Sequence, residues 1–184
     1  MDRNATGSDA VSRPGATGWH VQHPRFAAED LRRAFGCFPS GVVALCGLCD
    51  DAPVGMSVSS FTSVSLAPPL VSVCIARQSS TWKVLRHLLR IGLSVLAEDH
   101  GQVCRALAAK DADRFGSVPW QASERGAVFV ADASLHIECS IEREIDAGDH
   151  VLVLLAIEAL RSDPAVAPLV FHGSRFRQLS PART

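Results

Sequence analysis

Short hydroxyl side chains are concentrated in one stretch of the sequence, GMSVSSFTSVSLAPPL, which covers residues 55–70. Strand-like alternation would place five of its side chains on one face: Ser57, Ser59, Phe61, Ser63 and Ser65. Hydroxyl groups donate and accept hydrogen bonds and take up little space, so this face is suited to a flat ring with polar edges. An ordinary solvated strand, in which serine and threonine are common, is the open alternative.

A second group of hydroxyls follows a buried strand in CIARQSSTWK, residues 74–83. Ser79, Ser80 and Thr81 stand where a helix should begin, just after Arg77. The free N–H groups of a helix start, together with a nearby cation, favour a bound phosphate. The alternative is simple capping of the helix by Ser79 or Ser80. Arg114, in KDADRF, is a second basic candidate unless it belongs to a solvated loop.

We call the serine-rich face at residues 57–65 the ring slot and the possible phosphate site at residues 77–81 the anion seat. A ring slot followed by an anion seat matches the two ends of flavin mononucleotide (FMN), its isoalloxazine ring and its terminal phosphate. Other motifs are absent or incomplete: there is no G-x-G-x-x-G after a strand and no P-loop. GMSVS matches only the first half of a nucleophile elbow, because Ser59 replaces its second glycine. Cys46 and Cys49 form a lone C-x-x-C whose side chains would point to opposite faces of a strand. We interpret them as small buried hydrophobic residues.

The composition of the 184-residue chain is typical of one globular domain, with 47% hydrophobic residues. A net charge of −1 gives no reason to expect nucleic acid as a partner. No apolar run approaches the roughly 20 residues of a membrane span. The N-terminal segment lacks the apolar core of a signal peptide, so we expect a cytoplasmic protein without a disulfide framework.

Hydrophobic spacing predicts a mainly β domain over residues 25–180, between a flexible tail at 1–24 and a short tail at 181–184. Helices are expected from Phe26 to between Gly36 and Pro39, and over residues 79–90 and 98–110. Strands are expected over 42–48, 54–61, 69–76, 91–97, 134–145, 149–160, 168–173 and 175–179. The short turns between most strands favour an antiparallel barrel with helices packed outside.

With these elements in place, the sequence resembles the flavin reductase family of the FMN-binding split barrel, the small reductase components of two-component flavin-dependent monooxygenases. The most specific match is G-M-S-x-x-S-F-T-S-V-S-L-x-P-P-L, followed by G-D-H at 148–150. Further matching pieces occur in order across residues 26–179: FGCFPSGV, LSVLAEDH, DRF and PLVFHGSRF. The resemblance implies a six-stranded antiparallel Greek-key split barrel, commonly a homodimer, with flavin near the subunit interface. It also implies hydride transfer from NADH or NADPH to FMN or FAD, and delivery of the reduced flavin to a partner monooxygenase.

The resemblance also assigns site residues. The flavin ring would contact Ser57, Val58, Ser59 and Ser60, with further backbone contacts from Ser65 and Leu66. Arg77, Ser80 and Thr81 would lie near the ribityl phosphate, and Arg114 and Phe115 would close the pocket. His150 would line the nicotinamide side, and His172 is an outlying candidate.

Three other functions stay open at this point. A flavin carrier or sensor would share the site without turnover, and a self-contained flavoenzyme would keep FMN tightly and reduce an organic substrate. A haem-binding relative would use His150 or His172 as an axial ligand. No basic cluster marks a site for a 2′-phosphate, so NADH is favoured over NADPH.

Overall fold

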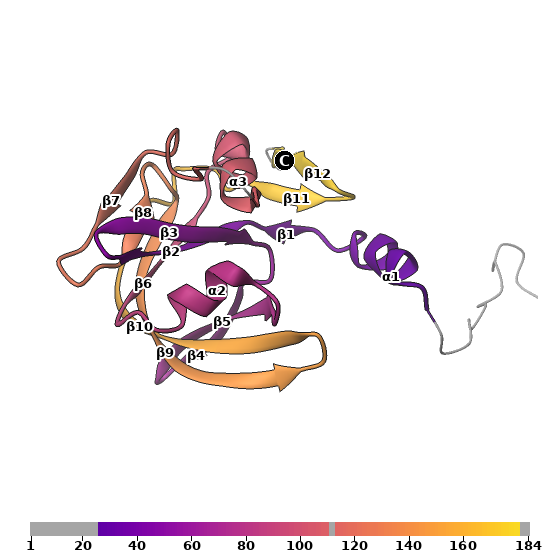
Figure 1. Ribbon diagram of the computed structural model, residues 1–184. Helices are drawn as coiled ribbons and strands as arrows, with labels where there is room; N and C mark the ends of the chain where they lie inside the picture. Colours follow the sequence, from indigo (N-terminus) through magenta and orange to yellow (C-terminus); the bar gives the residue numbers. More distant parts are fainter. Residues whose placement is uncertain (1–25, 111–112, 181–184) are drawn as a thin grey trace, which may run out of the picture.

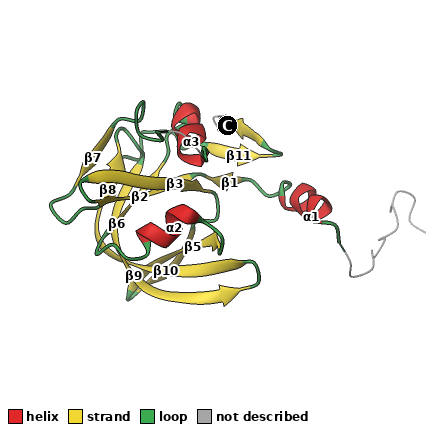
Figure 2. Cartoon of the chain, viewed as in Figure 1, coloured by secondary structure: helices red, strands yellow, loops and turns green. Residues whose placement is uncertain are grey.

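The computed structural model describes residues 26–110 and 113–180, and the two predicted tails lie outside these residues. The described chain consists mainly of strands, with three helices (Figures 1 and 2). The helices are α1 (Ala28–Phe35), α2 (Ser80–Leu85) and α3 (Gly101–Ala108). The strands are β1 (Ser40–Gly41), β2 (Val43–Cys49), β3 (Ala52–Val58), β4 (Thr62–Leu66), β5 (Pro69–Ala76), β6 (Ile91–Val95), β7 (Trp120–Ala122), β8 (Val128–Val130), β9 (Leu135–Ala147), β10 (His150–Ser162), β11 (Val170–His172) and β12 (Arg175–Arg177).

Seven strands form one antiparallel sheet in the order β3-β2-β6-β9-β10-β5-β4. β3 and β4 follow each other in the chain but stand at opposite ends of this sheet. The four steps from Val58 to Thr62 span at most about 14 Å. The sheet therefore has to curl until its two ends approach each other at this corner. β3 and β4 do not pair there, and the result is the predicted antiparallel split barrel with flanking helices.

The corner between β3 and β4 corrects the prediction of a continuous strand over residues 54–61. Ser60 leaves the strand path, and its Oγ donates to the carbonyl of Cys74 at 2.9 Å and accepts from the N–H of Cys74 at 2.8 Å. These two bonds attach the corner to β5. Because the chain bends here, the hydroxyls at 57–65 do not share one face. β4 lies beyond the strand expected over residues 54–61, and with it the sheet has seven strands where the family resemblance implied a six-stranded barrel.

The barrel interior is filled by apolar side chains from alternating positions of the strands, such as Leu45, Val73, Leu93 and Val153. Trp82 of α2 packs into the same cluster and is 3% exposed. A second apolar cluster lies outside the barrel wall and holds α3 against β2, and α3 also contacts β3. The buried members of this cluster include Ala44, Cys46, Leu96, Leu107, Val128 and Leu169. The two clusters thus place α2 and α3 on either side of β3 (Figure 1).

Several element boundaries differ from the sequence prediction. α2 ends at Leu85 rather than at residue 90, and α3 spans a shorter range than 98–110. β7 and β8 form a hairpin between α3 and β9, in a part of the chain where the sequence analysis predicted no strand. α1 forms as predicted but contributes no buried side chain, and it projects away from the barrel (Figure 1). Among the described helices, none is long and apolar enough to cross a membrane.

Candidate functional site

Three adjoining hollows follow β3, and we refer to them together as the β3 groove. The first hollow has a volume of about 670 Å³ and reaches from Ser59 to Ser57. The middle hollow, of about 520 Å³, includes Ser57 and Met56. The third hollow, of about 410 Å³, continues along Gly55, Val54 and Pro53. Neighbouring hollows share lining residues, so the groove runs continuously from the end of β3 to its beginning.

The backbone of β3 is available to a ligand because β3 is an edge strand. Among the described strands its only neighbour is β2, so within this part of the chain the opposite edge carries N–H and C=O groups without a strand partner. The carbonyl of Gly55 points to this edge, where it accepts from Arg114. The two-residue period of a strand directs the backbone groups of Ser57 the same way. Pro53 fits this arrangement, because an edge position does not require its missing N–H.

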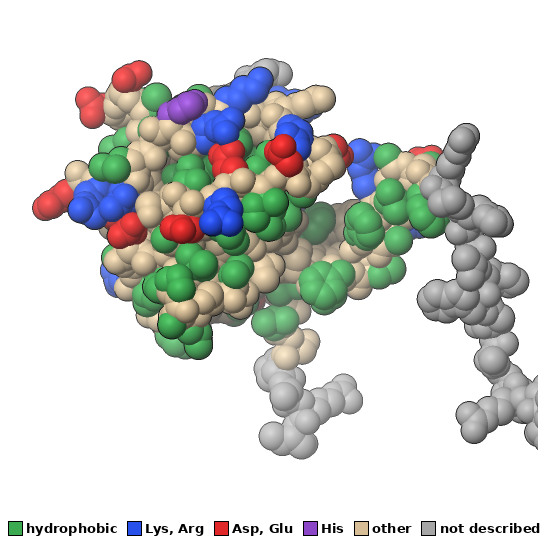
Figure 3. All heavy atoms as spheres, turned by 90° about the horizontal axis from the view of Figure 1, so that it is seen from below, with side chains coloured by type: hydrophobic (Ala, Val, Ile, Leu, Met, Phe, Trp, Pro, Cys, Tyr) green, Lys and Arg blue, Asp and Glu red, His purple; other side chains and the backbone are tan. Residues whose placement is uncertain are grey.

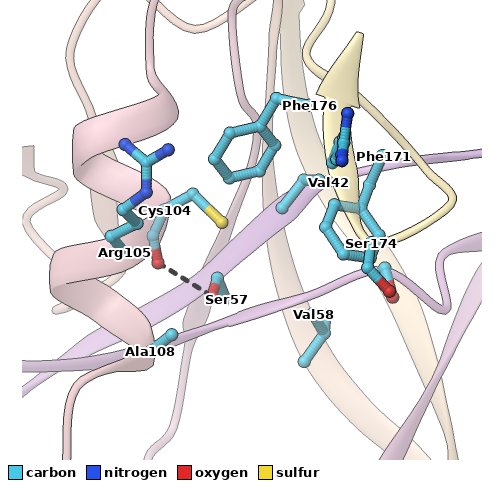
Figure 4. A pocket seen from close by; sticks show the side chains of 11 residues that line it. Val42, Ser57, Val58, Cys104, Arg105, Ala108, Phe171, Ser174 and Phe176 are labelled. Atoms are coloured by element: carbon cyan, nitrogen blue, oxygen red, sulfur yellow. Dashed lines mark hydrogen bonds between the residues drawn. The ribbon is translucent and has the colours of Figure 1, made fainter.

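The first hollow combines small polar residues on one side with two aromatic rings on the other (Figure 4). Ser57 and Ser59 line it from β3, and the Ser57 hydroxyl donates to the carbonyl of Cys104 at 3.2 Å. Phe171 and Phe176 line it from the β11–β12 hairpin, with ring centroids 5.8 Å apart. The predicted slot with short hydroxyls is therefore present at Ser57 and Ser59, without Ser63 and Ser65.

Helix α3 closes the first hollow with Cys104, Arg105 and Ala108 (Figure 4). The guanidinium carbon of Arg105 lies 5.1 Å from the centre of the Phe176 ring. Burial raises the pKa of the Cys104 thiol, and the neighbouring Ser57 hydroxyl and the charge of Arg105 partly oppose this shift. The thiol is consequently neutral near pH 7, and it adds soft apolar surface to the hollow.

The middle hollow brings together several residues that the sequence had indicated as an anion seat. Ser79, Ser80, Thr81 and Arg114 all line it, together with Lys110. The Ser79 hydroxyl accepts from the N–H of Trp82 at 3.1 Å, so Ser79 serves as the N-cap of α2. The Ser79 O–H is directed at Met56 Sδ, 3.8 Å away, which leaves the hydroxyls of Ser80 and Thr81, rather than all three, to donate to an anion.

Arg114 connects three elements around the middle hollow. Its Nε donates to the carbonyl of Ala109 at 2.6 Å, and its Nη1 donates to the carbonyl of Gly55 at 2.8 Å and to Thr81 Oγ1 at 2.6 Å. These bonds hold the guanidinium between α2, α3 and β3. The positive charge therefore has a defined orientation toward the groove.

Phe115 lies beside Arg114 and packs on the backbone of β3. A Cβ atom at Gly55 would lie 2.9 Å from Phe115 Cζ and 2.5 Å from Cys46 Sγ, so only glycine permits this approach. The Phe115 ring also makes an edge contact with Trp120, with centroids 6.5 Å apart. Phe115 thereby forms part of the wall of the third hollow.

Arg77 lies away from the lining of the three hollows. Its Nε donates to the carbonyl of Gly148 at 2.8 Å, and its Nη2 lies 2.9 Å from Asp146 Oδ1. The pairing of β5 with β10 brings the end of β5 to the turn between β9 and β10, and Arg77 binds that turn. We therefore leave Arg77 out of the anion seat, contrary to the sequence-based expectation.

His150 begins β10 and lies opposite Ala76 of β5. It is half-buried, and its Nδ1 lies 2.7 Å from Asp149 Oδ1. This hydrogen bond and the charge of the imidazole lower the pKa of Asp149. His150 does not line the three hollows, but Cys74, which binds Ser60, is only two residues from Ala76 on β5. His150 is thus close to the corner end of the β3 groove.

Three further candidates lie outside the groove. His172 is half-buried next to Phe171 on β11, but it is Phe171 that lines the first hollow. Ser65 and Leu66 lie on β4, at the other end of the sheet. Leu66 is 95% exposed, so within one chain it has little contact with any element.

The two cysteines of the C-x-x-C differ in burial. Cys46 is fully buried, and burial raises the pKa of its thiol to about 12, as suits a small apolar residue. Cys49 is only half-buried. Within residues 26–110 and 113–180, no group of three or more His, Cys, Asp or Glu side chains is placed to hold a metal ion.

The fold and the groove define an antiparallel split barrel with a candidate ligand site along its open edge. Residues 35–180 match the family described as flavin reductase like domain, and the chain belongs to this family. It is 32% identical over 156 residues to the flavin-dependent monooxygenase reductase subunit HsaB of Mycobacterium tuberculosis, covering 84% of this chain and 83% of that protein. It is 36% identical to an NADH-dependent FAD reductase of Streptomyces globisporus, covering 82% of this chain and 85% of that protein.

Solved structures have the same fold. The Streptomyces globisporus NADH:FAD oxidoreductase SgcE6, in complex with NAD and FAD fragments, superposes with a TM-score of 0.79 at 37% identity, covering 83% of this chain and 93% of that one. BorF, the flavin reductase component of a bacterial two-component tryptophan halogenase, superposes with a TM-score of 0.76 at 31% identity, covering 85% of this chain and all of the other.

The residues of the β3 groove fit a flavin. The open edge of β3 offers backbone donors and acceptors to the polar side of a ring, and Ser57 and Ser59 leave space for it. Phe171 and Phe176 offer apolar surface across the same hollow. The middle hollow then supplies a fixed guanidinium and two hydroxyls for a phosphate. The aromatic and α3 residues escaped sequence analysis because no short motif indicates that α3 and β11 meet over β3.

Proposed function

We propose that this protein is an NAD(P)H-dependent flavin reductase that uses NADH to reduce FMN or FAD and supplies reduced flavin to a partner monooxygenase. The β3 groove carries this proposal, because it offers a ring slot and an anion seat in the order a flavin requires. The named relatives support it, since they include an NADH-dependent FAD reductase and reductase subunits of monooxygenases. The flavin supplies the chemistry by accepting a hydride from the nicotinamide, and the protein supplies binding and orientation.

In this proposal, Ser57, Val58 and Ser59 hold the ring in the first hollow through hydroxyl and backbone groups. Ser80, Thr81 and Arg114 bind the phosphate in the middle hollow, and Phe115 supports the groove wall. Donors directed at the ring favour the negative charge that develops as the ring is reduced. Hydride transfer needs aligned rings rather than a strong base. The groove can therefore support the reaction without a catalytic dyad.

We assign His150 a positioning role for the nicotinamide at the corner end of the groove. Its imidazole is oriented by Asp149 and held beside β5. Ala76, which pairs with His150, lies two residues from Cys74, the residue that Ser60 binds. Two residues correspond to about 7 Å along a strand. This proximity supports the positioning role. A second copy of the chain that covered this face would complete the site for the nicotinamide.

A homodimer is part of the proposal. α1 is an amphipathic helix without a buried side chain, and Phe35 and Phe38 at its end are 70% and 77% exposed. Hydrophobic side chains are visible on this projection in Figure 3. Leu66 on β4 is also almost fully exposed, and exposed large apolar side chains on α1 and β4 support a protein interface. All six cysteines are free, which supports a reducing compartment such as the cytoplasm.

The deciding experiment is NADH oxidation by the purified protein with and without added FMN, FAD or riboflavin. Saturable turnover that depends on added flavin is the expected result. Flavin binding without NADH oxidation would overturn the reductase function in favour of a carrier. Turnover that persists after gel filtration, without added flavin, would instead indicate an enzyme that retains its flavin.

A further inference from the structure

Two further hollows lie between the β7–β8 hairpin, the start of β9 and the end of β10, and the hairpin is on the side of the barrel opposite α1 (Figure 1). We call the first, of about 270 Å³, the polar hollow, because its lining includes Asp132 and Asp163. The second, of about 210 Å³, is the apolar hollow, whose lining includes Phe129, Ala159 and Leu160. The two hollows form one continuous site, since both are lined by Gln121, His136 and Arg161.

Strand pairing brings the shared residues together. His136 of β9 pairs with Arg161 of β10, and Gln121 of β7 pairs with Phe129 of β8. The side chains of directly paired residues lie on the same face of an antiparallel pair. The rings of Phe129 and His136 make an edge contact with centroids 5.5 Å apart, and this contact joins the two strand pairs. The site is therefore built on regular strands.

The polar hollow is rich in hydrogen-bond acceptors. His136 Nε2 lies 2.7 Å from the carbonyl oxygen of Val130. A carbonyl only accepts, so in the neutral ring Nε2 carries the hydrogen and Nδ1 is an acceptor. Asp132 and Asp163 add two carboxylates, and the N–H of Ala165 donates to Asp163 Oδ1 at 3.0 Å, which orients that carboxylate. This set of acceptors suits the ammonium group of a ligand.

The positive charge of the site comes from Arg161. Its side chain lines both hollows, and it takes part in no ion pair within the described residues. Arginine can bind a carboxylate through two parallel hydrogen bonds, and the amide of Gln121 can donate another. A simple anion beside Arg161 would be opposed by the charges of Asp132 and Asp163. A zwitterion, in contrast, offers a partner to both kinds of group.

The apolar hollow offers space for an apolar side chain next to these charges. Phe129 and Leu160 line it, and Leu160 is 62% exposed. A ligand side chain would therefore remove apolar surface from water. Glu138 lines the same hollow, but its Oε1 lies 3.5 Å from Arg90 Nε. Its charge is thus balanced within the protein.

We propose that the two hollows bind a free α-amino acid with an apolar side chain, such as leucine or phenylalanine. Arg161 and Gln121 bind its carboxylate. Asp132, Asp163 and Nδ1 of His136 accept from its ammonium group, and its side chain enters the apolar hollow. Among the described residues, those that line this site are different from those that line the β3 groove. The inference therefore does not depend on the proposed function.

Calorimetry with the full-length protein tests this site with L-leucine and L-phenylalanine. Saturable binding of both is the expected result. Arg161→Gln should weaken leucine binding at least tenfold, because it removes the bidentate partner of the carboxylate. Arg143→Gln, at an exposed position of β9, is the matched control and should leave the affinity unchanged. Equal weakening by the two variants, or no binding of either amino acid by wild type, would overturn the inference.

Ligand analogues test the recognition of each group without changing the protein. Glycine lacks the side chain, N-acetylleucine lacks the ammonium and leucinamide lacks the carboxylate, so each should bind at least tenfold more weakly than leucine. Leucinamide that bound as tightly as leucine would indicate a site for a peptide N-terminus, and the free amino acid assignment would be wrong. Saturating FMN should leave leucine affinity unchanged. Mutually exclusive binding of FMN and leucine would place leucine in the β3 groove and would also overturn the inference.

Discussion

Thr81 and Arg114 lie 33 positions apart in the sequence and are joined by a 2.6 Å hydrogen bond from Nη1 to Oγ1. Thr81 is buried, and the same nitrogen also binds the carbonyl of Gly55. Arg114 has five N–H donors, and its bonds to Ala109, Gly55 and Thr81 involve only Nε and Nη1. Within the described residues, the two N–H groups of Nη2 are left for a ligand in the middle hollow.

Replacing Arg114 should therefore weaken phosphate recognition selectively. We expect Arg114→Ala to raise the Kd of FMN at least tenfold, since a hydrogen bond to a charged group contributes about 1.5–3 kcal/mol. Riboflavin has no phosphate, so its Kd should change by less than threefold. Fluorescence titration of both flavins measures the two effects, with Arg125→Ala as an exposed control. Equal weakening of FMN and riboflavin would show that Arg114 only supports the fold.

The His150 assignment separates nicotinamide binding from flavin binding. We expect His150→Ala to raise the KM of NADH several-fold, because the imidazole beside Asp149 orients the nicotinamide. The Kd of FMN should stay within about twofold, since His150 does not line the three hollows. Steady-state kinetics at saturating flavin provides the test. The positioning role would be wrong if the variant kept both the KM of NADH and the turnover number of wild type.

The sequence was most informative where one face of a strand is buried and side chains alternate regularly. The strands β2, β5, β6 and β10 match their predicted ranges closely, because a shift of one residue would move the apolar set out of the core. The corner at Ser60 was missed for the opposite reason. Its hydroxyl binds the backbone of Cys74, a contact between distant segments that alternation within one strand cannot indicate.

The candidate site shows the same difference between local sequence patterns and contacts made by distant segments. Ser57, Ser59, Ser80, Thr81 and Arg114 were predicted from local composition and family resemblance, and the fold brings them to one groove. Arg77 was placed with them because it is close in sequence to Ser80. It instead binds the turn at Gly148, since antiparallel pairing of β5 with β10 determines what lies beside it.

Ser60 provides a test of the barrel corner. Ser60→Ala would leave both the N–H and the carbonyl of Cys74 without their partner at a partly buried position. We expect a loss of about 2 kcal/mol in the free energy of unfolding. Urea denaturation measures this loss, and Ser63→Ala, at an exposed position of β4, should cost less than about 0.5 kcal/mol. A cost at Ser60 no larger than at Ser63 would contradict the corner's structural role.

Leu66 provides a test of the proposed homodimer. We expect Leu66→Asp to convert a dimer into a monomer, because a buried unpaired carboxylate is strongly unfavourable at an apolar interface. Sedimentation velocity across a concentration series measures the change. Leu160→Asp is a useful comparison, since Leu160 is 62% exposed on β10 but lies outside the proposed interface of α1 and β4. A monomeric wild type, or an unaffected dimer in Leu66→Asp, would sink this assignment.

Glu158 links stability to pH on the acid side. Its pKa is lowered from the ordinary value of 4.5, first by the hydrogen bond from Ser140 and then by the charge of Arg90. The folded state therefore favours the ionised carboxylate. Its stabilising contribution is present above pH 4.5 and is lost as the pH falls through the lower folded-state pKa.

We therefore expect Glu158→Gln to be less stable than wild type at pH 6, with the difference shrinking below pH 4.5. Urea unfolding at intervals from pH 6 to about pH 3.5 covers this window. Glu142→Gln removes an exposed carboxylate on β9 that has no ion-pair partner within the described residues, and it serves as the comparison for the loss of one surface charge. A Glu158→Gln difference that grows as the pH falls would have the opposite sign and would refute the assigned interaction with Ser140 and Arg90.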